Sequence, residues 1–164
     1  MSQYKRFNVN PFGKEDSGDC VVRAIALGTK TDYKKVCEMF NKKFKKGKGL
    51  DDQISITDVR NFEKKYNTIK TVLFDKSFIE YVYQNGEYKK PAENRKLKEF
   101  CDKFSGKYIL LLRTSEFDFK KEASREAVKY TFHAVYCDAS DKKYYDIMKN
   151  DPGNMTIFWV YRVV

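Results

Sequence analysis

The hydrophobic pattern of the sequence changes its period once, near residue 107. Before that point apolar residues recur at the three- and four-residue spacing of helices, and after it they form short runs of strand length. Tyr108–Leu112 is one such run, and three more lie within residues 131–137, 143–148 and 156–163. Helices followed by strands predict an α+β fold, in which N-terminal helices pack on a C-terminal antiparallel sheet.

The length of the chain fits one domain. Its 164 residues are enough to bury a core, and 41% of them are hydrophobic and 16% aromatic, which excludes disorder as the main state. We therefore expect residues 1–164 to form a single domain, with a helical part over about 19–104 and a sheet part over about 107–164.

Helical spacing begins abruptly after a turn-rich start. Asp19 is a good N-cap for an almost entirely apolar helix that runs over Cys20–Leu27 and ends at Gly28. Thr31 can cap a second helix, whose apolar stripe consists of Tyr33, Val36, Cys37, Phe40 and Phe44.

The rest of the first part is expected to contain two more helices, a strand at about 68–74 and several loops. The helices are expected at about 57–66 and 92–104, and residues 1–18 are expected to be irregular. Two polar segments, 76–91 and 115–129, are expected to form the walls of a cleft.

The start of the first helix holds the candidate nucleophile, Cys20. The positive end of a helix dipole favours a thiolate, and an adjacent imidazole activates a cysteine at neutral pH. His133 is the only histidine of the chain, so it is the only candidate for that base. Because Cys37, Cys101 and Cys137 lie far apart and form no Cys-x-x-Cys pair, we expect no metal site and no cofactor.

A carboxylate that orients this base is predicted from the register of a hairpin. If Ala139 and Ser140 form the centre of the hairpin between the second and third strands, His133 and Asp146 lie directly opposite each other. Asp146 then holds one imidazole nitrogen, as the third member of a catalytic triad. A shift of one residue would place the two side chains on opposite faces.

Each of these residues also has a plainer interpretation. A cysteine in an apolar helix is more often an inert buried thiol, and a lone histidine on a strand is usually satisfied by local partners. The joint pattern favours chemistry, because Gly18 and Asp19 expose the helix start at Cys20 while Asp146 stands in hairpin register with His133.

Several short motifs resemble the papain-like cysteine peptidase superfamily. They are GDCVVRAIA at 18–26, GKYIL at 106–110, HAV at 133–135 and YYD at 144–146. The chain is most similar to small phage and prophage proteins of this superfamily and, more distantly, to bacteriocin-processing peptidases. The resemblance implies a papain-like fold with the nucleophile helix first and a Cys–His–Asp triad formed by Cys20, His133 and Asp146.

The resemblance also implies a donor for the oxyanion. The family usually carries a glutamine about six residues before the nucleophile, and Lys14 stands there in this sequence. We therefore nominate the nearby amide of Asn10 as the donor, together with the backbone N–H of Cys20.

These features predict a phage-type papain-like cysteine hydrolase that cleaves a peptide, isopeptide or related amide bond in a protein or peptide, such as a host protein. Two alternatives stay open. The same triad serves a thiol acyltransferase when an amine replaces water. The missing glutamine favours an inactive papain-like scaffold that binds and inhibits a host or defence protein.

The net charge of +10 is a weaker indication of function. Only seven of the 33 basic residues are arginine, and abundant Lys, Asn, Tyr, Phe and Ile are typical of an AT-rich coding sequence. The densest basic run, Lys42–Lys48, contains one aromatic residue, which leaves nucleic-acid binding a minor alternative. Neither a membrane-spanning stretch nor a signal peptide is found, so we expect a cytoplasmic protein, in a host cell if phage-encoded, with no membrane partner.

Overall fold

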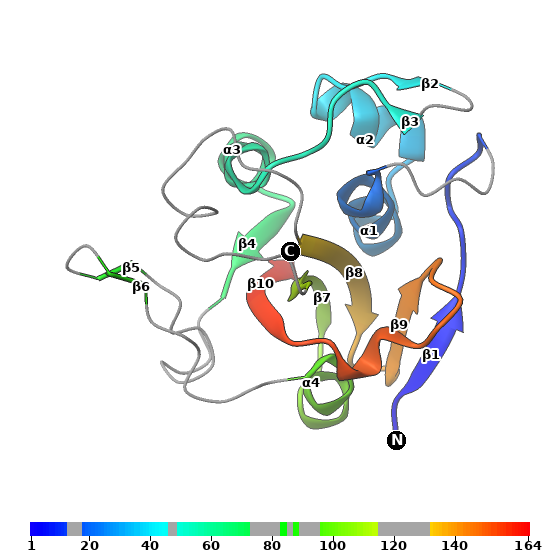
Figure 1. Cartoon of the computed structure of the whole chain (residues 1–164), viewed down its shortest axis with the longest axis vertical. Coiled ribbons are helices and arrows are strands. Elements are labelled where there is room, and N and C mark those ends of the chain that lie inside the picture. Colours follow the sequence, from blue (N-terminus) through cyan, green and yellow to red (C-terminus); the bar gives the residue numbers. More distant parts are fainter. Residues whose placement is uncertain (13–17, 46–48, 73–82, 85–86, 89–95, 115–131) are drawn as a thin grey trace.

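A computed structural model of the chain describes residues 1–12, 18–45, 49–72, 83–84, 87–88, 96–114 and 132–164. The described part is a mixed α/β structure in which four α-helices surround one six-stranded sheet (Figure 1). The helices are α1 (Cys20–Thr29), α2 (Tyr33–Met39), α3 (Ile56–Tyr66) and α4 (Leu97–Lys103). In spatial order the sheet contains β1 (Gln3–Arg6), β9 (Lys143–Asp146), β8 (Phe132–Asp138), β7 (Lys107–Arg113), β10 (Ile157–Val163) and β4 (Ile69–Thr71).

Short elements complete the described structure. Two hairpins lie outside the sheet, β2 (Phe44–Lys45) with β3 (Gly49–Leu50) and β5 (Tyr83–Gln84) with β6 (Glu87–Tyr88). A 3₁₀ turn over Pro152–Asn154 precedes β10. The predicted cleft wall at 115–129 lies outside the described residues, as does most of the one at 76–91.

The sheet is mixed, which corrects the expectation of a purely antiparallel sheet. The strands from the second half of the chain pair antiparallel, but β1 adds parallel to β9 at one edge, with Gln3 opposite Lys143 and Arg6 opposite Asp146. We expected residues 1–18 to be irregular. Four largely exposed residues on an edge strand show no alternation of polar and apolar side chains, so the sequence pattern contains no strand signal there.

The strand β4 also joins the sheet from the helical part of the chain. It pairs antiparallel with β10, so that Ile69 lies opposite Val163. The end of α3 is tied to it, because the Glu63 carboxylate accepts hydrogen bonds from the backbone N–H and the hydroxyl of Thr71. The order of helices first and sheet second therefore holds only in outline.

The helix α1, which begins at Cys20, continues past Gly28, where we expected it to end. A Cβ at Gly28 would lie 2.8 Å from Ile109 Cδ1 and 3.1 Å from Tyr136 Cδ1. The glycine therefore lets the helix approach β7 and β8 closely, and the helix ends only at Lys30, whose φ is 55°. The glycine that we interpreted as the end of the helix is therefore needed for close packing against the sheet.

The second helix differs at both ends from the prediction. Its N-cap is Asp32 rather than Thr31, and the Asp32 side chain accepts hydrogen bonds from Lys34 N and Lys35 N. The helix ends at Met39, after which the left-handed Asn41 turns the chain and Phe44 enters β2. The third helix is confirmed, and its start carries a capping box between Ser55 and Asp58.

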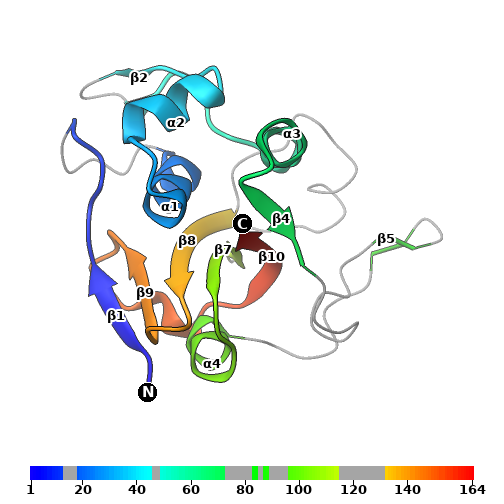
Figure 2. The ribbon, with the colours of Figure 1, turned by 180° about the vertical axis from the view of Figure 1, so that it is seen from behind.

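The core lies between the sheet and the helices on its two sides. Figures 1 and 2 show α1 and α4 on opposite sides of β7 and β8. Gly28 of α1 packs closely toward Ile109, whereas Phe100 of α4 contacts the preceding residue of β7, Tyr108. No helix among the described residues has both the length and the apolar character needed to cross a membrane.

Candidate active site

The base and its carboxylate meet through a hairpin whose register differs from the predicted one. Tyr136 lies opposite Tyr145 and Asp138 opposite Lys143, so the turn is centred one position later than we expected, and all pairs shift by two residues. His133 and Asp146 are therefore diagonal neighbours. A shift of two keeps both side chains on one face, and His133 Nε2 lies 2.6 Å from Asp146 Oδ2.

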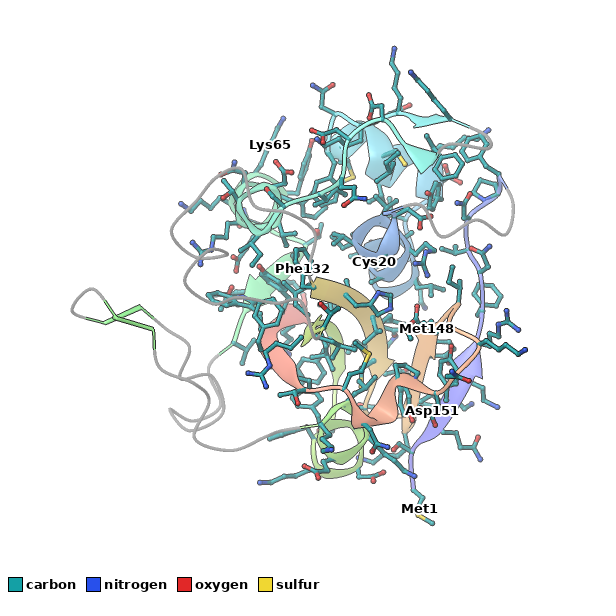
Figure 3. All side chains as sticks on the ribbon, in the orientation of Figure 1. Met1, Cys20, Lys65, Phe132, Met148 and Asp151 are labelled. Carbon is teal, nitrogen blue, oxygen red and sulfur yellow. The ribbon has the colours of Figure 1, made fainter. Side chains whose placement is uncertain are left out.

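Cys20 approaches the same imidazole from the helix side. It is the first residue of α1, it lines the same pocket as His133, and it lies near enough to raise the pKa of that imidazole. Because Asp146 occupies Nε2 of the imidazole, Nδ1 is the nitrogen left for the sulfur. In Figure 3 Cys20 lies where α1 faces the start of β8, near the labelled Phe132. The structure thus brings together the three residues that the sequence singled out.

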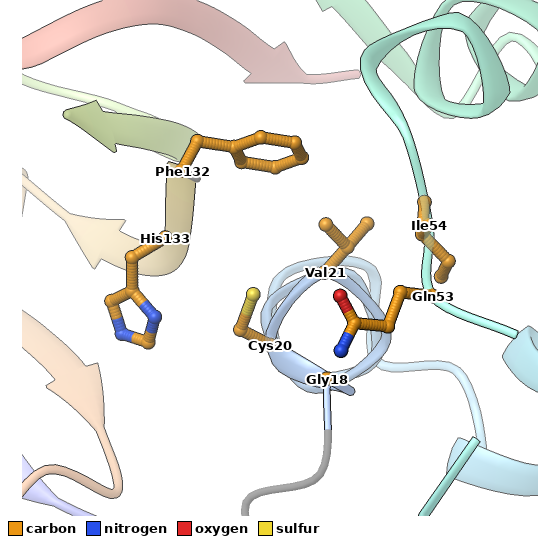
Figure 4. Close-up of a pocket in the computed structure, with 7 residues that line it drawn as sticks. All are labelled: Gly18, Cys20, Val21, Gln53, Ile54, Phe132 and His133. Carbon is orange, nitrogen blue, oxygen red and sulfur yellow. The ribbon is translucent and has the colours of Figure 1, made fainter. Parts of the chain in front are cut away.

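The thiol opens into a pocket of about 210 Å³. Its lining combines Cys20 and His133 with three apolar side chains, one amide and one glycine, namely Gly18, Cys20, Val21, Gln53, Ile54, Phe132 and His133. Figure 4 shows the Cys20 sulfur between the imidazole on one side and the Gln53 amide on the other, with Val21, Ile54 and Phe132 beyond it. An acyl group that enters this pocket would meet the sulfur and an amide together.

The electrostatics of the site favour a protonated imidazole. Burial by itself lowers the pKa of His133, but the hydrogen bonds and charges of Asp146 and Cys20 outweigh it and raise that pKa to about 10. Burial by itself raises the pKa of Asp146, yet the bond to His133 and the nearby Arg23 hold it below its usual value. The carboxylate is therefore ionised and the imidazole positively charged at neutral pH.

Two further buried charges adjoin the triad. Asp19, Arg23 and Asp146 expose 0%, 3% and 2% of their surface. Arg23 Nε donates to Asp19 Oδ1 at 2.9 Å, and Arg23 Nη1 donates to Asp146 Oδ1 at 3.3 Å. Asp19 occupies the N-cap position that we predicted but makes no side-chain capping bond. Arg23 is the one charged residue in an apolar helix, which is the signal that points to it.

The nominated oxyanion donor, Asn10, lies elsewhere. Its Nδ2 donates to Asp19 Oδ2 at 2.9 Å and its Oδ1 accepts from Phe12 N, and it does not line the pocket. The amide in the pocket belongs to Gln53, which follows the nucleophile in sequence. A residue in the loop before α3 carries no local pattern that would mark it, so sequence reasoning missed it.

The remaining cysteines and the basic run lie apart from this pocket. Cys37, Cys101 and Cys137 are buried free thiols, and among the described residues no cluster of three metal-ligating side chains occurs. In the basic run, Lys42 Nζ pairs with Asp52 Oδ2 at 3.0 Å, and the Phe44 ring stacks on another ring of this chain. Positions 46–48 of the run lie outside the described residues.

Comparison of the chain with protein families, curated proteins and solved structures gives no match.

Proposed function

We propose that this chain is a cysteine-dependent hydrolase that cleaves a peptide, isopeptide or related amide bond. One observation carries the proposal: the Cys20 thiol and the His133 imidazole line one pocket, and the Asp146 carboxylate is hydrogen-bonded to that imidazole. A buried histidine that served only the fold would need hydrogen-bond partners for its ring, but it would not need a thiol beside its second nitrogen. The chain order also agrees with the papain-like resemblance, which supports a papain-like arrangement.

The chemistry needs no further group. Cys20 attacks the acyl carbon as a thiolate and forms a C–S bond, and the electron pair of the carbonyl moves to its oxygen. As the C–N bond breaks, the His133 imidazolium gives its proton to the leaving amine. Water then attacks the thioester and His133 takes a proton from it, so that the C–S bond breaks, the acid is released and the thiolate and imidazolium are restored. Asp146 keeps the imidazole oriented throughout.

Two donors can stabilise the oxyanion that forms in each half of this reaction. The first N–H groups of a helix have no intrahelical partner, and Cys20 provides one at the start of α1. Gln53 provides the other, because its amide lies in the pocket beside the sulfur (Figure 4). Gln53 Oε1 is buried and accepts no hydrogen bond from a described residue, so no such bond is lost when the amide turns Nε2 toward an oxyanion.

The first test is site-resolved alkylation with iodoacetamide, followed by mass spectrometry. We expect Cys20 to react much faster than the three buried cysteines, and His133→Gln to slow it at pH 7 by at least about tenfold, because the adjacent positive charge that supports the thiolate is lost. Greater exposure alone explains the first result but not the second. If His133→Gln leaves the rate at Cys20 unchanged, the catalytic proposal is wrong.

The second test is acylation by 4-nitrophenyl acetate. We expect release of 4-nitrophenolate with an acetyl group on Cys20, detected by mass, and its slow loss to water. Cys20→Ser is the matched control, because a serine hydroxyl in the same place is a far weaker nucleophile. An acetyl group that appears on lysines only, at equal rates in both proteins, would contradict the proposal.

A further inference from the structure

The triad belongs to a closed ring of buried groups that runs back to the nucleophile. Asp146 Oδ2 bonds His133, whereas its Oδ1 accepts from Arg23 Nη1 at 3.3 Å and from Ile147 N at 2.8 Å. Arg23 Nε bonds Asp19 Oδ1 at 2.9 Å. Asp19 directly precedes Cys20 in the chain, and Cys20 lines the same pocket as His133 and raises its pKa, which closes the ring.

The ring is also fixed from outside. Asp19 Oδ2 accepts from Tyr33 Oη at 2.8 Å and from Asn10 Nδ2 at 2.9 Å, which ties it to α2 and to the segment after β1. Every carboxylate oxygen of Asp19 therefore has a donor. Tyr4 of β1 faces Asp146, and mainly through burial, with that charge second, its pKa rises to about 12, so this phenol stays neutral.

Apart from Cys20, the charges of the ring balance only when the imidazole is protonated. Asp19 and Asp146 are negative and Arg23 is positive, which leaves one negative charge that no other described buried cation offsets. Arg6, which lies opposite Asp146 on β1, is exposed and donates to Ile147 O, and neither Lys5 of β1 nor Lys143 of β9 is buried. Because unbalanced charge is costly inside a protein, the proton on His133 completes the ring.

We propose that Arg23 and Asp19 are positioning residues of the active site: Arg23 clamps Oδ1 of Asp146 so that Oδ2 faces His133, and the Asp19–Arg23 pair sets the charge against which His133 is protonated. Only the expected effect of these two residues on catalysis rests on the proposed function. The geometry itself links the residue before the nucleophile to the carboxylate on the far strand, so that α1 orients both ends of the triad.

The single histidine makes the electrostatic part directly measurable. The pKa of His133 is read from the pH dependence of one imidazole resonance by NMR, in Arg23→Met, in Asp19→Asn and in the double variant. We expect Arg23→Met to raise it and Asp19→Asn to lower it, each by about one pH unit. The double variant removes one charge of each sign and should return near the wild-type value. A purely structural role would not produce shifts of opposite sign.

The clamp is tested separately with Arg23→Lys, which keeps the charge. We expect an unchanged His133 pKa but an acylation rate with 4-nitrophenyl acetate that falls about tenfold, because one ammonium does not reproduce two guanidinium bonds. If Arg23→Met does not fold, Asp19→Asn and Arg23→Lys still decide the question. The inference is overturned if Asp19→Asn leaves the titration unmoved, or if Arg23→Lys acylates at the wild-type rate.

These outcomes are distinct from failure of the proposed function. The titration needs no substrate, so opposite shifts with an inert Cys20 would uphold the charge balance and reject the hydrolase. If Cys20 is alkylated as expected but the His133 pKa is the same in all variants, the hydrolase proposal stands and the charge balance is rejected.

Discussion

At the scale of single residues, the pocket depends on a glycine that precedes the nucleophile. Gly18 has a φ of 75°, and a Cβ there would lie 2.7 Å from Gln53 Cγ and 3.1 Å from Gln53 Nε2. The Gln53 side chain therefore lies directly against this backbone, beside Cys20. Gly18 is required both for its left-handed conformation and for the space that the amide occupies.

Replacement of Gln53 tests its role as an oxyanion donor. Gln53→Ala should lower turnover by about 10² to 10³, the usual effect of removing one such donor, while alkylation of Cys20 by iodoacetamide changes little. Gln53→Glu has the same shape without a donor at pH 8, and we expect the same loss. Wild-type turnover in Gln53→Glu would exclude the amide from the reaction.

The raised pKa of His133 predicts a pH dependence of stability. The folded pKa lies above the unfolded value of about 6.5, so this contribution is complete below pH 6.5 and is lost as the pH rises toward the folded pKa. In a Cys20→Ala background Asp146 alone still raises that pKa, so the free energy of unfolding should fall as the pH rises from about 6.5 to 8, by at most about 1.4 kcal/mol per pH unit. Urea denaturation measures it.

The matched control for that experiment is the double variant Cys20→Ala/His133→Gln, which lacks the titrating ring. The difference between the two unfolding curves cancels all other groups. Parallel curves over this pH range would show that His133 has the same pKa in both states.

The triad was predictable from the sequence because its members are scarce and locally marked. Cys20 begins an apolar helix, His133 has no competitor, and Asp146 follows in hairpin register. The register was wrong by two residues, yet the face was right because the period of a strand is two. The place of Gln53 in the pocket and the ion pair between Arg23 and Asp146 were not predictable, since these contacts join segments that no local pattern relates.

At the scale of elements, β1 supports the strand that carries the triad carboxylate. Phe7 N donates to Asp146 O at 2.8 Å, directly after the parallel pairing of Arg6 with Asp146. The Phe7 side chain is 51% exposed, so the residue contributes mainly through its backbone. The edge strand thus holds Asp146 from the side opposite to His133's own strand.

A proline at position 7 distinguishes the contribution of the backbone N–H from that of the phenylalanine side chain. Phe7→Pro removes the N–H that bonds Asp146, and we expect a loss of about 0.5–1.5 kcal/mol in the free energy of unfolding, with slower alkylation of Cys20. Phe7→Ala keeps the N–H and should stay within about 0.5 kcal/mol of wild type. Equal effects of the two substitutions would contradict a role for β1 in the site.

At the scale of the whole molecule, the sequence predicted which residues form helices better than how the strands pair. The four helices and the strands after residue 107 follow from local spacing. The parallel addition of β1 and the placement of β4 beside β10 are long-range contacts, which periodicity does not encode. Gly28 led us to predict a helix end at the wrong place, because this glycine is required by the close approach of the sheet and not by a turn of the chain.

The buried cysteines offer a test of whether the chain unfolds as one unit. Cys37 lies in α2, Cys101 in α4 and Cys137 in β8, so together they report on both parts of the chain. In a Cys20→Ser background we expect the three to become reactive to a thiol reagent over one common range of urea concentration. Exposure of Cys37 well before Cys137 would instead reveal two separate domains.

The position of β10 has a consequence for the order of events during synthesis. It follows every other described strand in the chain, yet it lies inside the sheet, between β7 and β4. On a ribosome, β4 therefore waits without a partner until residues 157–163 have emerged. The nucleophile at Cys20 is among the first residues made, and its base arrives more than a hundred residues later. The growing chain thus carries an unpaired thiol until its sheet is nearly complete.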